Sequence, residues 1–113
     1  MSDPSPIVAT TLYRIVREGL NNANKHAHGA TVTVLLYGDQ DSGFGARITD
    51  DGPGFAPHGD GRSPQGHLGL SSMHERAEAL GGWVRIDSAP GSGTVIEVWL
   101  PQKPHVLTEL PAA

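Results

Sequence analysis

Residues 31–55 read TVTVLLYGDQDSGFGARITDDGPGF, and this stretch decides the fold. Its first part, Thr31–Tyr37, is β-branched and apolar, which predicts a strand. Residues 38–43 (GDQDSG) predict a turn, and Phe44–Thr49 predict a second strand of weaker pattern. Two strands joined by so short a turn favour an antiparallel hairpin, which here runs into two adjacent carboxylates.

The chain before this hairpin has the pattern of an amphipathic helix. Apolar or small residues recur at steps of three and four from Ile7 to Ala27, which predicts roughly 20 residues of helix. Gly29 is the expected stop. After the hairpin, residues 51–69 are so rich in glycine and proline that we expect a long loop, which in a small domain is usually functional or mobile.

The C-terminal half again has the order helix then hairpin. Its expected elements are a helix from Leu70 to Leu80, a strand at 83–87, a turn at 89–93 and a strand at 94–100. This order is not strict β–α–β alternation. It favours an α+β two-layer sandwich, in which helices cover one face of a mixed, mainly antiparallel sheet.

Composition narrows the classes of function. The 113 residues carry eight basic and twelve acidic side chains, a formal net charge of −4, which argues against a nucleic-acid-binding protein. An anionic ligand must then be held locally by backbone N–H groups, a metal ion or a few cations. The absence of cysteine excludes disulfides, thiolate zinc sites and cysteine nucleophiles. No run of about 18 apolar residues occurs, so we expect a soluble segment, even if its parent protein is membrane-anchored. The absence of cysteine fits a cytoplasmic location.

Four polar residues of the first predicted helix form a candidate site: Glu18, Asn22, Lys25 and His26. Their spacing puts them within an arc of about 100° that borders the apolar stripe. A carboxylate, an amide oxygen and a cation at a half-buried edge suit a Mg²⁺–phosphate ligand. An ordinary solvated helix face explains the same pattern.

Three glycine motifs form a second group of candidates. Asp50–Phe55 (DDGPGF) follows a strand, and its glycines would let a flat ring approach the backbone. The same sequence pattern is also typical of a tight surface turn. Gly66–Leu70 (GHLGL) leads into the second predicted helix, where free backbone N–H groups suit phosphate binding. The same sequence is also compatible with a loop that is only a flexible hinge. Gly91–Thr94 (GSGT) is most simply a hairpin turn.

Taken together and in order, these motifs resemble one family. EGLNNANKHA (18–27) resembles the asparagine box of histidine-kinase ATP-binding domains, DDGPGF their first glycine box and GHLGLSSMHERAEALGG (66–82) their second. GSGTVIEVWLP (91–101) resembles their closing hairpin, and the second box resembles the branch with DesK and NarX-like sensors. The resemblance covers residues 10–101 and implies the Bergerat ATP-binding fold of gyrase B and MutL.

The resemblance also implies roles and two cofactors, ATP and Mg²⁺. Asn22 would hold Mg²⁺, Lys25 would contact phosphate and Asp50 would accept the adenine amino group. Glu18 would be the catalytic residue, bound to the metal through water, that orients water or assists proton transfer. The other implied ATP-binding residues are His26, Gly52, Gly54, Gly66, His67, Leu68, Gly69, Leu70 and Thr94.

One departure from the family is the missing acceptor domain. Family kinases carry the phosphorylated histidine on a separate dimerising helix pair, and nothing in this sequence matches it. We therefore expect an ATP-binding domain (7–101), with a loose start (1–6) and a tail (102–113), that serves an acceptor domain and a downstream response regulator. The alternatives are a serine kinase of the anti-sigma-factor type and a non-catalytic ATP-binding module. His74 precedes an acidic residue as an acceptor would, but it lies inside the second helix.

Overall fold

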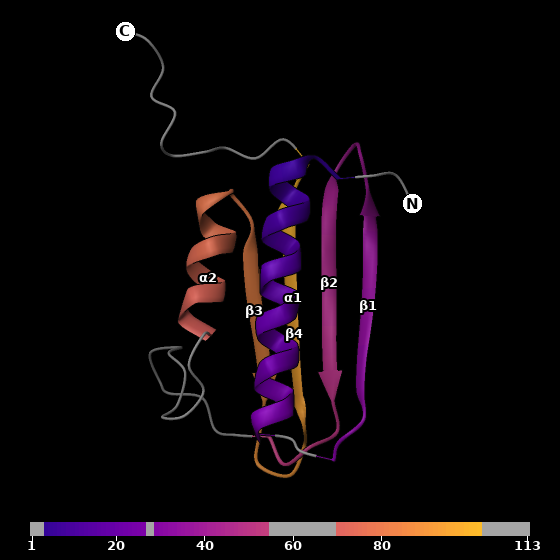
Figure 1. Ribbon diagram of the computed structural model, residues 1–113, viewed down its shortest axis with the longest axis vertical. Helices are drawn as coiled ribbons and strands as arrows, with labels where there is room; N and C mark the ends of the chain where they lie inside the picture. The colour runs from indigo at the N-terminus through magenta and orange to yellow at the C-terminus, as the bar shows by residue number, and fades with distance from the viewer. Residues whose placement is uncertain (1–3, 27–28, 55–69, 103–113) are drawn as a thin grey trace, which may run out of the picture.

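The computed structural model describes residues 4–26, 29–54 and 70–102, which form two helices and four strands (Figure 1). In chain order the elements are α1 (Pro6–His26), β1 (Val32–Asp39), β2 (Gly43–Asp50), α2 (Leu70–Ala79), β3 (Trp83–Ser88) and β4 (Thr94–Pro101). All six were expected from the sequence, with ends that differ by one or two residues at most positions.

The four strands form one sheet in the order β1-β2-β4-β3. The predicted hairpins β1–β2 and β3–β4 are both present, and β2 pairs with β4 between them. All three pairings of the described strands are antiparallel, which confirms the antiparallel character of the expected sheet. The two-layer α+β architecture is also confirmed.

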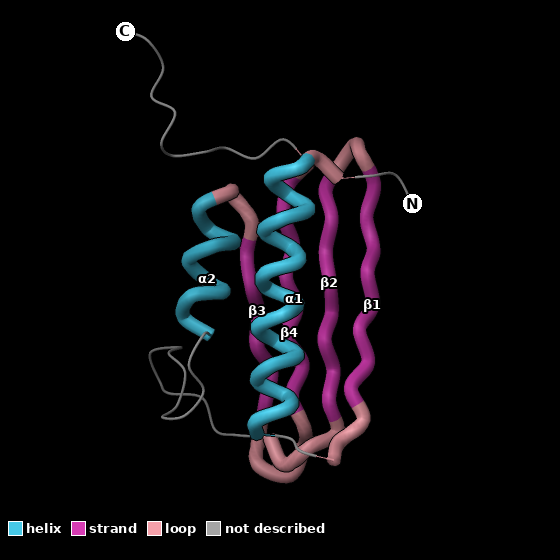
Figure 2. Tube along the Cα trace, viewed as in Figure 1, coloured by secondary structure: helices cyan, strands magenta, loops and turns pink. Residues whose placement is uncertain are grey.

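Both helices cover the same face of the sheet (Figure 2). Alternate strand residues point towards them, because successive side chains of a strand face opposite sides. The core between the layers contains Val8, Ile15, Phe44, Ala46, Ile48, Met73, Ala77, Leu80, Val84, Ile96, Val98 and Leu100. At Gly19 the helix comes so close to the sheet that a Cβ atom would lie 2.8 Å from Cδ1 of Ile48.

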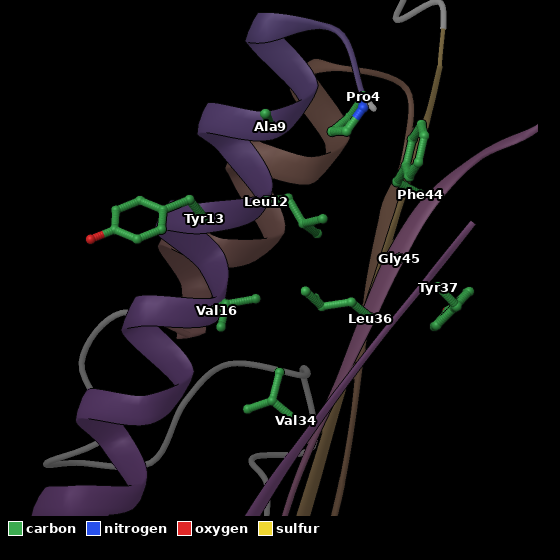
Figure 3. Close-up of a pocket in the computed structure, with 10 residues that line it drawn as sticks. All are labelled: Pro4, Ala9, Leu12, Tyr13, Val16, Val34, Leu36, Tyr37, Phe44 and Gly45. Atoms are coloured by element: carbon green, nitrogen blue, oxygen red, sulfur yellow. The ribbon is translucent and has the colours of Figure 1, made fainter. Parts of the chain in front are cut away.

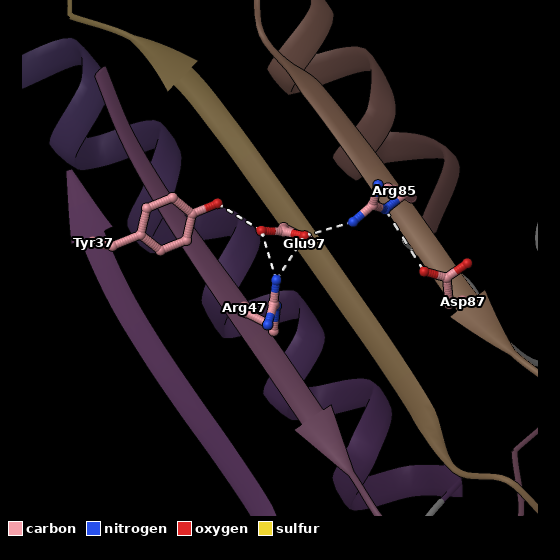
Figure 4. Close-up of polar contacts among 5 residues, drawn as sticks. All are labelled: Tyr37, Arg47, Arg85, Asp87 and Glu97. Carbon is pink, nitrogen blue, oxygen red and sulfur yellow. Dashed lines mark hydrogen bonds and ion pairs between the residues drawn. The ribbon is translucent and has the colours of Figure 1, made fainter. Parts of the chain in front are cut away.

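The face of the sheet that lies away from the helices carries a polar cluster centred on Glu97 (Figure 4). Its carboxylate accepts hydrogen bonds from Tyr37 at 2.8 Å and from Nη2 of Arg85 at 2.9 Å. Nη2 of Arg47 contacts both carboxylate oxygens at 3.4 Å. The hydrogen bond from Tyr37 is the main cause that lowers the pKa of Glu97. The charges of Arg47 and Arg85 also lower this pKa, whereas burial of the carboxylate raises it.

Candidate functional site

Polar side chains gather where β2 ends and β4 begins. Asp50 and Thr94 are directly opposite in the β2–β4 register, and Ser88 is opposite Thr94 in the β3–β4 register. Two residues away on each strand lie Ile48 and Ile96 of the core and Ile86, which packs against the core, so all three polar residues lie on the helix-covered side. The C-terminal end of α1 reaches the same end of the sheet (Figure 1).

The two adjacent carboxylates have different surroundings. Oδ1 of Asp50 accepts a 3.0 Å hydrogen bond from the backbone of Gly52, two residues later in its own loop. Asp51 instead ties the loop to the start of β1, since its Oδ1 accepts from the N–H of Thr31 at 2.7 Å and its own N–H donates to the Thr31 carbonyl. Asp51 therefore has a structural role, and Asp50 is the carboxylate on the side of the helices.

Glycines allow the loop after β2 to pack on the turn before β4. Gly54 and Gly93 have positive φ angles of 68° and 72°. A Cβ atom on Gly54 would overlap the carbonyl oxygen of Ala89, and one on Gly93 would overlap that of Asp50. A backbone hydrogen bond of 2.6 Å from Gly91 to Pro53 joins the two segments. Close packing of main chain on main chain thus brings Asp50 beside the turn.

Asn22 of α1 is the buried member of the predicted helical arc. It is 8% exposed, and its Nδ2 has no hydrogen-bond partner among residues 4–26, 29–54 and 70–102. Glu18, one turn earlier, is half-buried, and Lys25 is exposed. A buried amide without a partner costs free energy, so its presence indicates a group that is satisfied by something else.

For several predicted site residues the structure gives no side-chain position. Gly66, His67, Leu68 and Gly69 lie outside the described residues. Leu70 begins α2 and His26 ends α1, but their side chains are not described. Gly52 and Gly54 are in the loop beside Asp50, where Gly54 already has a packing reason to be glycine.

A family model described as histidine kinase-, DNA gyrase B- and HSP90-like ATPase matches residues 7–104. The chain belongs to this ATPase family. Among its relatives, the nitrate/nitrite sensor protein NarQ of Escherichia coli (strain K12) is 37% identical over 87 residues, which are 77% of this chain and 15% of NarQ. The histidine-protein kinase/phosphatase UhpB of Salmonella typhimurium is 43% identical over 93 residues, 82% of this chain and 17% of UhpB.

The fold of a solved histidine kinase agrees with this membership. The mycobacterial sensor histidine kinase MprB superposes with a TM-score of 0.64 at 33% identity, over 86% of this chain and 74% of that structure. The expected resemblance to sensor histidine kinases is confirmed, and NarQ supports the branch of NarX-like sensors. This chain spans only a small part of the curated relatives. None of the described helices is long and apolar enough to cross a membrane.

Ser88 lies beside Thr94 in this candidate site, and it was not among the residues predicted from the sequence. Its Oγ lies 2.9 Å from Oγ1 of Thr94 and donates to the Gly93 carbonyl oxygen at 2.9 Å. Thr94 is only 8% exposed, so this pairing orients its hydroxyl beside the strand end. The signal that could have found Ser88 is the register of the second hairpin, which places it opposite Thr94 across the turn.

A separate hollow of about 250 Å³ lies between α1 and the strands β1 and β2 (Figure 3). Its walls are almost wholly apolar and include Leu12, Val16, Val34, Leu36 and Phe44. None of the described residues that line it is a carboxylate or a cation, so we do not assign the nucleotide to this hollow. No group of three or more His, Asp or Glu side chains that could hold a metal occurs in the described part of the chain.

Proposed function

We propose that this chain is the ATP-binding domain of a sensor histidine kinase, which binds Mg-ATP and supplies the γ-phosphoryl group to a histidine on a separate acceptor domain. The observation that carries the proposal is the juxtaposition of Asp50 and Thr94 at the end of the sheet reached by α1, which contributes Asn22, in a member of this ATPase family. The names of NarQ and UhpB as a sensor and a kinase support it.

The adenine base is assigned to the strand-end part of the site. Asp50 accepts the adenine amino group, and Thr94, oriented by Ser88, borders the ring. The loop glycines, among them Gly52 and Gly54, leave the backbone open beside the ring. A carboxylate is an acceptor only, so it pairs with the amino group of adenine and leaves the carbonyl of guanine without a donor.

The metal and the phosphates are assigned to α1 and to residues 66–70. Asn22 is assigned to Mg²⁺ through its carbonyl oxygen, the hard donor that Mg²⁺ prefers, while its buried Nδ2, which has no partner among the described residues, is free to donate a hydrogen bond to a phosphate oxygen. Glu18 contributes through a water molecule, and Lys25, with His26, neutralises phosphate charge. Gly66, His67, Leu68, Gly69 and Leu70 contribute backbone N–H groups at the start of α2. Bound Mg²⁺ neutralises charge that develops on the phosphate oxygens.

The reaction is a phosphoryl transfer from ATP to an imidazole. A ring nitrogen of the acceptor histidine forms a bond to the γ-phosphorus while the bond to the β–γ bridging oxygen breaks, and ADP leaves with that electron pair. The imidazole gives up its N–H proton, and we assign Glu18 to receive or orient it. The other side chains bind and position, which is the larger part of catalysis in phosphoryl transfer.

The test of the nucleotide assignment compares ATP with GTP by calorimetry. The parent should bind ATP more tightly, because two facing acceptors typically cost about 1–3 kcal/mol. Asp50→Asn should lose this preference, whereas the matched Asp51→Asn should keep it and lower only stability, since Asp51 bonds Thr31. Equal affinity of the parent for the two nucleotides would overturn the assignment.

The wider function is part of the same proposal. We take residues 7–101 as a cytoplasmic domain that works with an acceptor and dimerisation domain and, through it, with a response regulator. A serine kinase of the anti-sigma type would transfer phosphate to a protein serine, and a non-catalytic module would transfer none. Incubation with labelled ATP and a histidine-containing or serine-containing acceptor separates the three, because only phosphohistidine is acid-labile.

A further inference from the structure

Two hollows are lined by residues of both α1 and α2. One, of about 330 Å³, is lined by Ile7, Thr10, Thr11, Arg14, Arg76, Ala79 and Leu80. The other, of about 410 Å³, is lined by Arg14, Arg17, Glu18, Asn21 and Arg76. Arg14 and Arg76 line both, so the hollows adjoin at this arginine pair. Together they form one groove, called here the seam groove, with an apolar end and a cationic end.

The cationic end carries charge that the protein has not neutralised. Arg14, Arg17 and Arg76 are exposed, and none of them has a carboxylate within 4.0 Å among the described residues. By contrast, Arg47 and Arg85 on the open face of the sheet are both paired with Glu97. Among the described residues that line this hollow, three guanidinium groups face one carboxylate, that of Glu18, although the whole chain has a net charge of −4.

We propose that the seam groove is the docking site for an acidic amphipathic helix of the protein that carries the phosphoryl acceptor. Guanidinium forks bind carboxylates in pairs of parallel hydrogen bonds, which makes glutamate and aspartate their natural partners. The apolar end, with Ile7 45% exposed, takes the apolar residues of the same helix. A groove between two helices receives a third helix by the same packing.

The position of the groove connects it to the nucleotide site. Glu18 lines the cationic hollow and lies one helical turn before Asn22 on α1. A helix held by the three arginines therefore lies beside the carboxylate that we assign to proton transfer. This inference rests on the proposed function for the identity of the partner, whereas the docking itself does not require bound ATP.

The test uses the full 113-residue chain and two synthetic helical peptides of about 20 residues, long enough to span the groove. Both carry leucines along one face, and they differ only in having glutamate or glutamine beside that face. The glutamate peptide should bind in fluorescence anisotropy and the glutamine peptide should not. Arg14→Gln and Arg76→Gln should each weaken binding several-fold, and together at least tenfold.

The matched control is Arg85→Gln, which removes the same charge from the other face of the sheet and should leave peptide affinity unchanged. Equal weakening by Arg85→Gln would mean unspecific charge attraction and would overturn the proposal. Loss of Mg-ATP affinity in Arg14→Gln and Arg76→Gln would also overturn it, because the arginines would then belong to the nucleotide. If the parent binds the glutamate peptide but no ATP, the proposed function fails while the docking groove stands.

Discussion

The hydroxyl of Tyr37 in β1 donates a 2.8 Å hydrogen bond to Glu97 in β4, across the intervening strand β2. Gly45 lies opposite Tyr37 in β2, and a Cβ atom there would overlap the tyrosine ring. The glycine therefore provides the space through which the ring reaches the carboxylate. This one contact joins the edge strand of the first hairpin to the inner strand of the second.

Gly45→Ala should lower the free energy of unfolding by about 1–3 kcal/mol, because the ring must move and give up its hydrogen bond. Urea denaturation measures the change. In a Tyr37→Ala background the same substitution should cost less, since no ring is left to displace. An equal cost in both backgrounds would show that Gly45 matters for another reason.

Glu97 should make stability depend on pH in the acid range. Its folded-state pKa is lowered, first by the Tyr37 hydrogen bond, so its contribution is present above the ordinary glutamate range near pH ~4.3 and is lost as the pH falls through the folded-state pKa. Glu97→Gln should flatten the acid part of a plot of unfolding free energy against pH, and Tyr37→Phe should flatten it partly. Parallel curves for parent and Glu97→Gln would contradict this.

Tyr37 should make stability depend on pH in the alkaline range. Burial, followed by the hydrogen bond and charge of Glu97, raises its pKa to about 12. The stabilisation is therefore complete below the ordinary tyrosine pKa of about 10 and is lost between about 10 and 12. An ultraviolet titration of phenolate should show a late step in the parent that is absent in Tyr37→Phe and moves to lower pH in Glu97→Gln. A late step that survives in Tyr37→Phe would exclude this residue as its source.

Asn22→Ala should separate stability from ligand binding. Because Nδ2 has no partner among the described residues, the substitution removes no protein hydrogen bond from that atom, and stability should stay within about 1 kcal/mol of the parent. Mg-ATP affinity should fall at least tenfold, or about 1.4 kcal/mol. The control Asn24→Ala, at an exposed position of the same helix, should change neither. Unchanged Mg-ATP affinity in Asn22→Ala would end the metal assignment.

Gly91→Ala and Gly93→Ala form a matched pair in the turn before β4. Both glycines have positive φ, 82° and 72°, so alanine should cost about 1–2 kcal/mol at either position from backbone strain. A Cβ atom on Gly91 would point into open space, whereas one on Gly93 would overlap the Asp50 carbonyl. Gly93→Ala should therefore be clearly less stable in thermal melts and should also weaken ATP binding. Equal losses would mean that the contact with Asp50 is unimportant.

Local pattern was enough to predict the six elements, because strand alternation and helical spacing are properties of neighbouring residues. Helical spacing also placed Asn22 on an arc that borders the apolar stripe, and in the structure Asn22 is buried while its neighbours Asn21 and Asn24 are exposed. The strand order could not be predicted from such patterns. Nothing near β2 in sequence indicates that β4 pairs with it, since that pairing depends on contacts between distant segments.

The same limit applies inside the candidate site. Asp50 and Asp51 are alike in sequence, and only the hydrogen bonds to Thr31 identify Asp51 as the structural one. Gly54 was interpreted as space for a ligand, but its contact with Ala89 gives it a packing role that the loop sequence cannot reveal. Ser88 was missed for the same reason, because its partner Thr94 is across the hairpin.

The site is shared between two hairpins, and this governs when it can form. Asp50 ends the first hairpin and Thr94 begins a strand of the second, so they meet only after β2 has paired with β4. Each hairpin closes over a short turn, whereas that pairing closes a loop containing α2, which is the slower event in folding. A ligand that touches both strand ends finds nothing to bind until folding is almost complete. Such a ligand should therefore lower the rate of unfolding and leave the rate of folding unchanged.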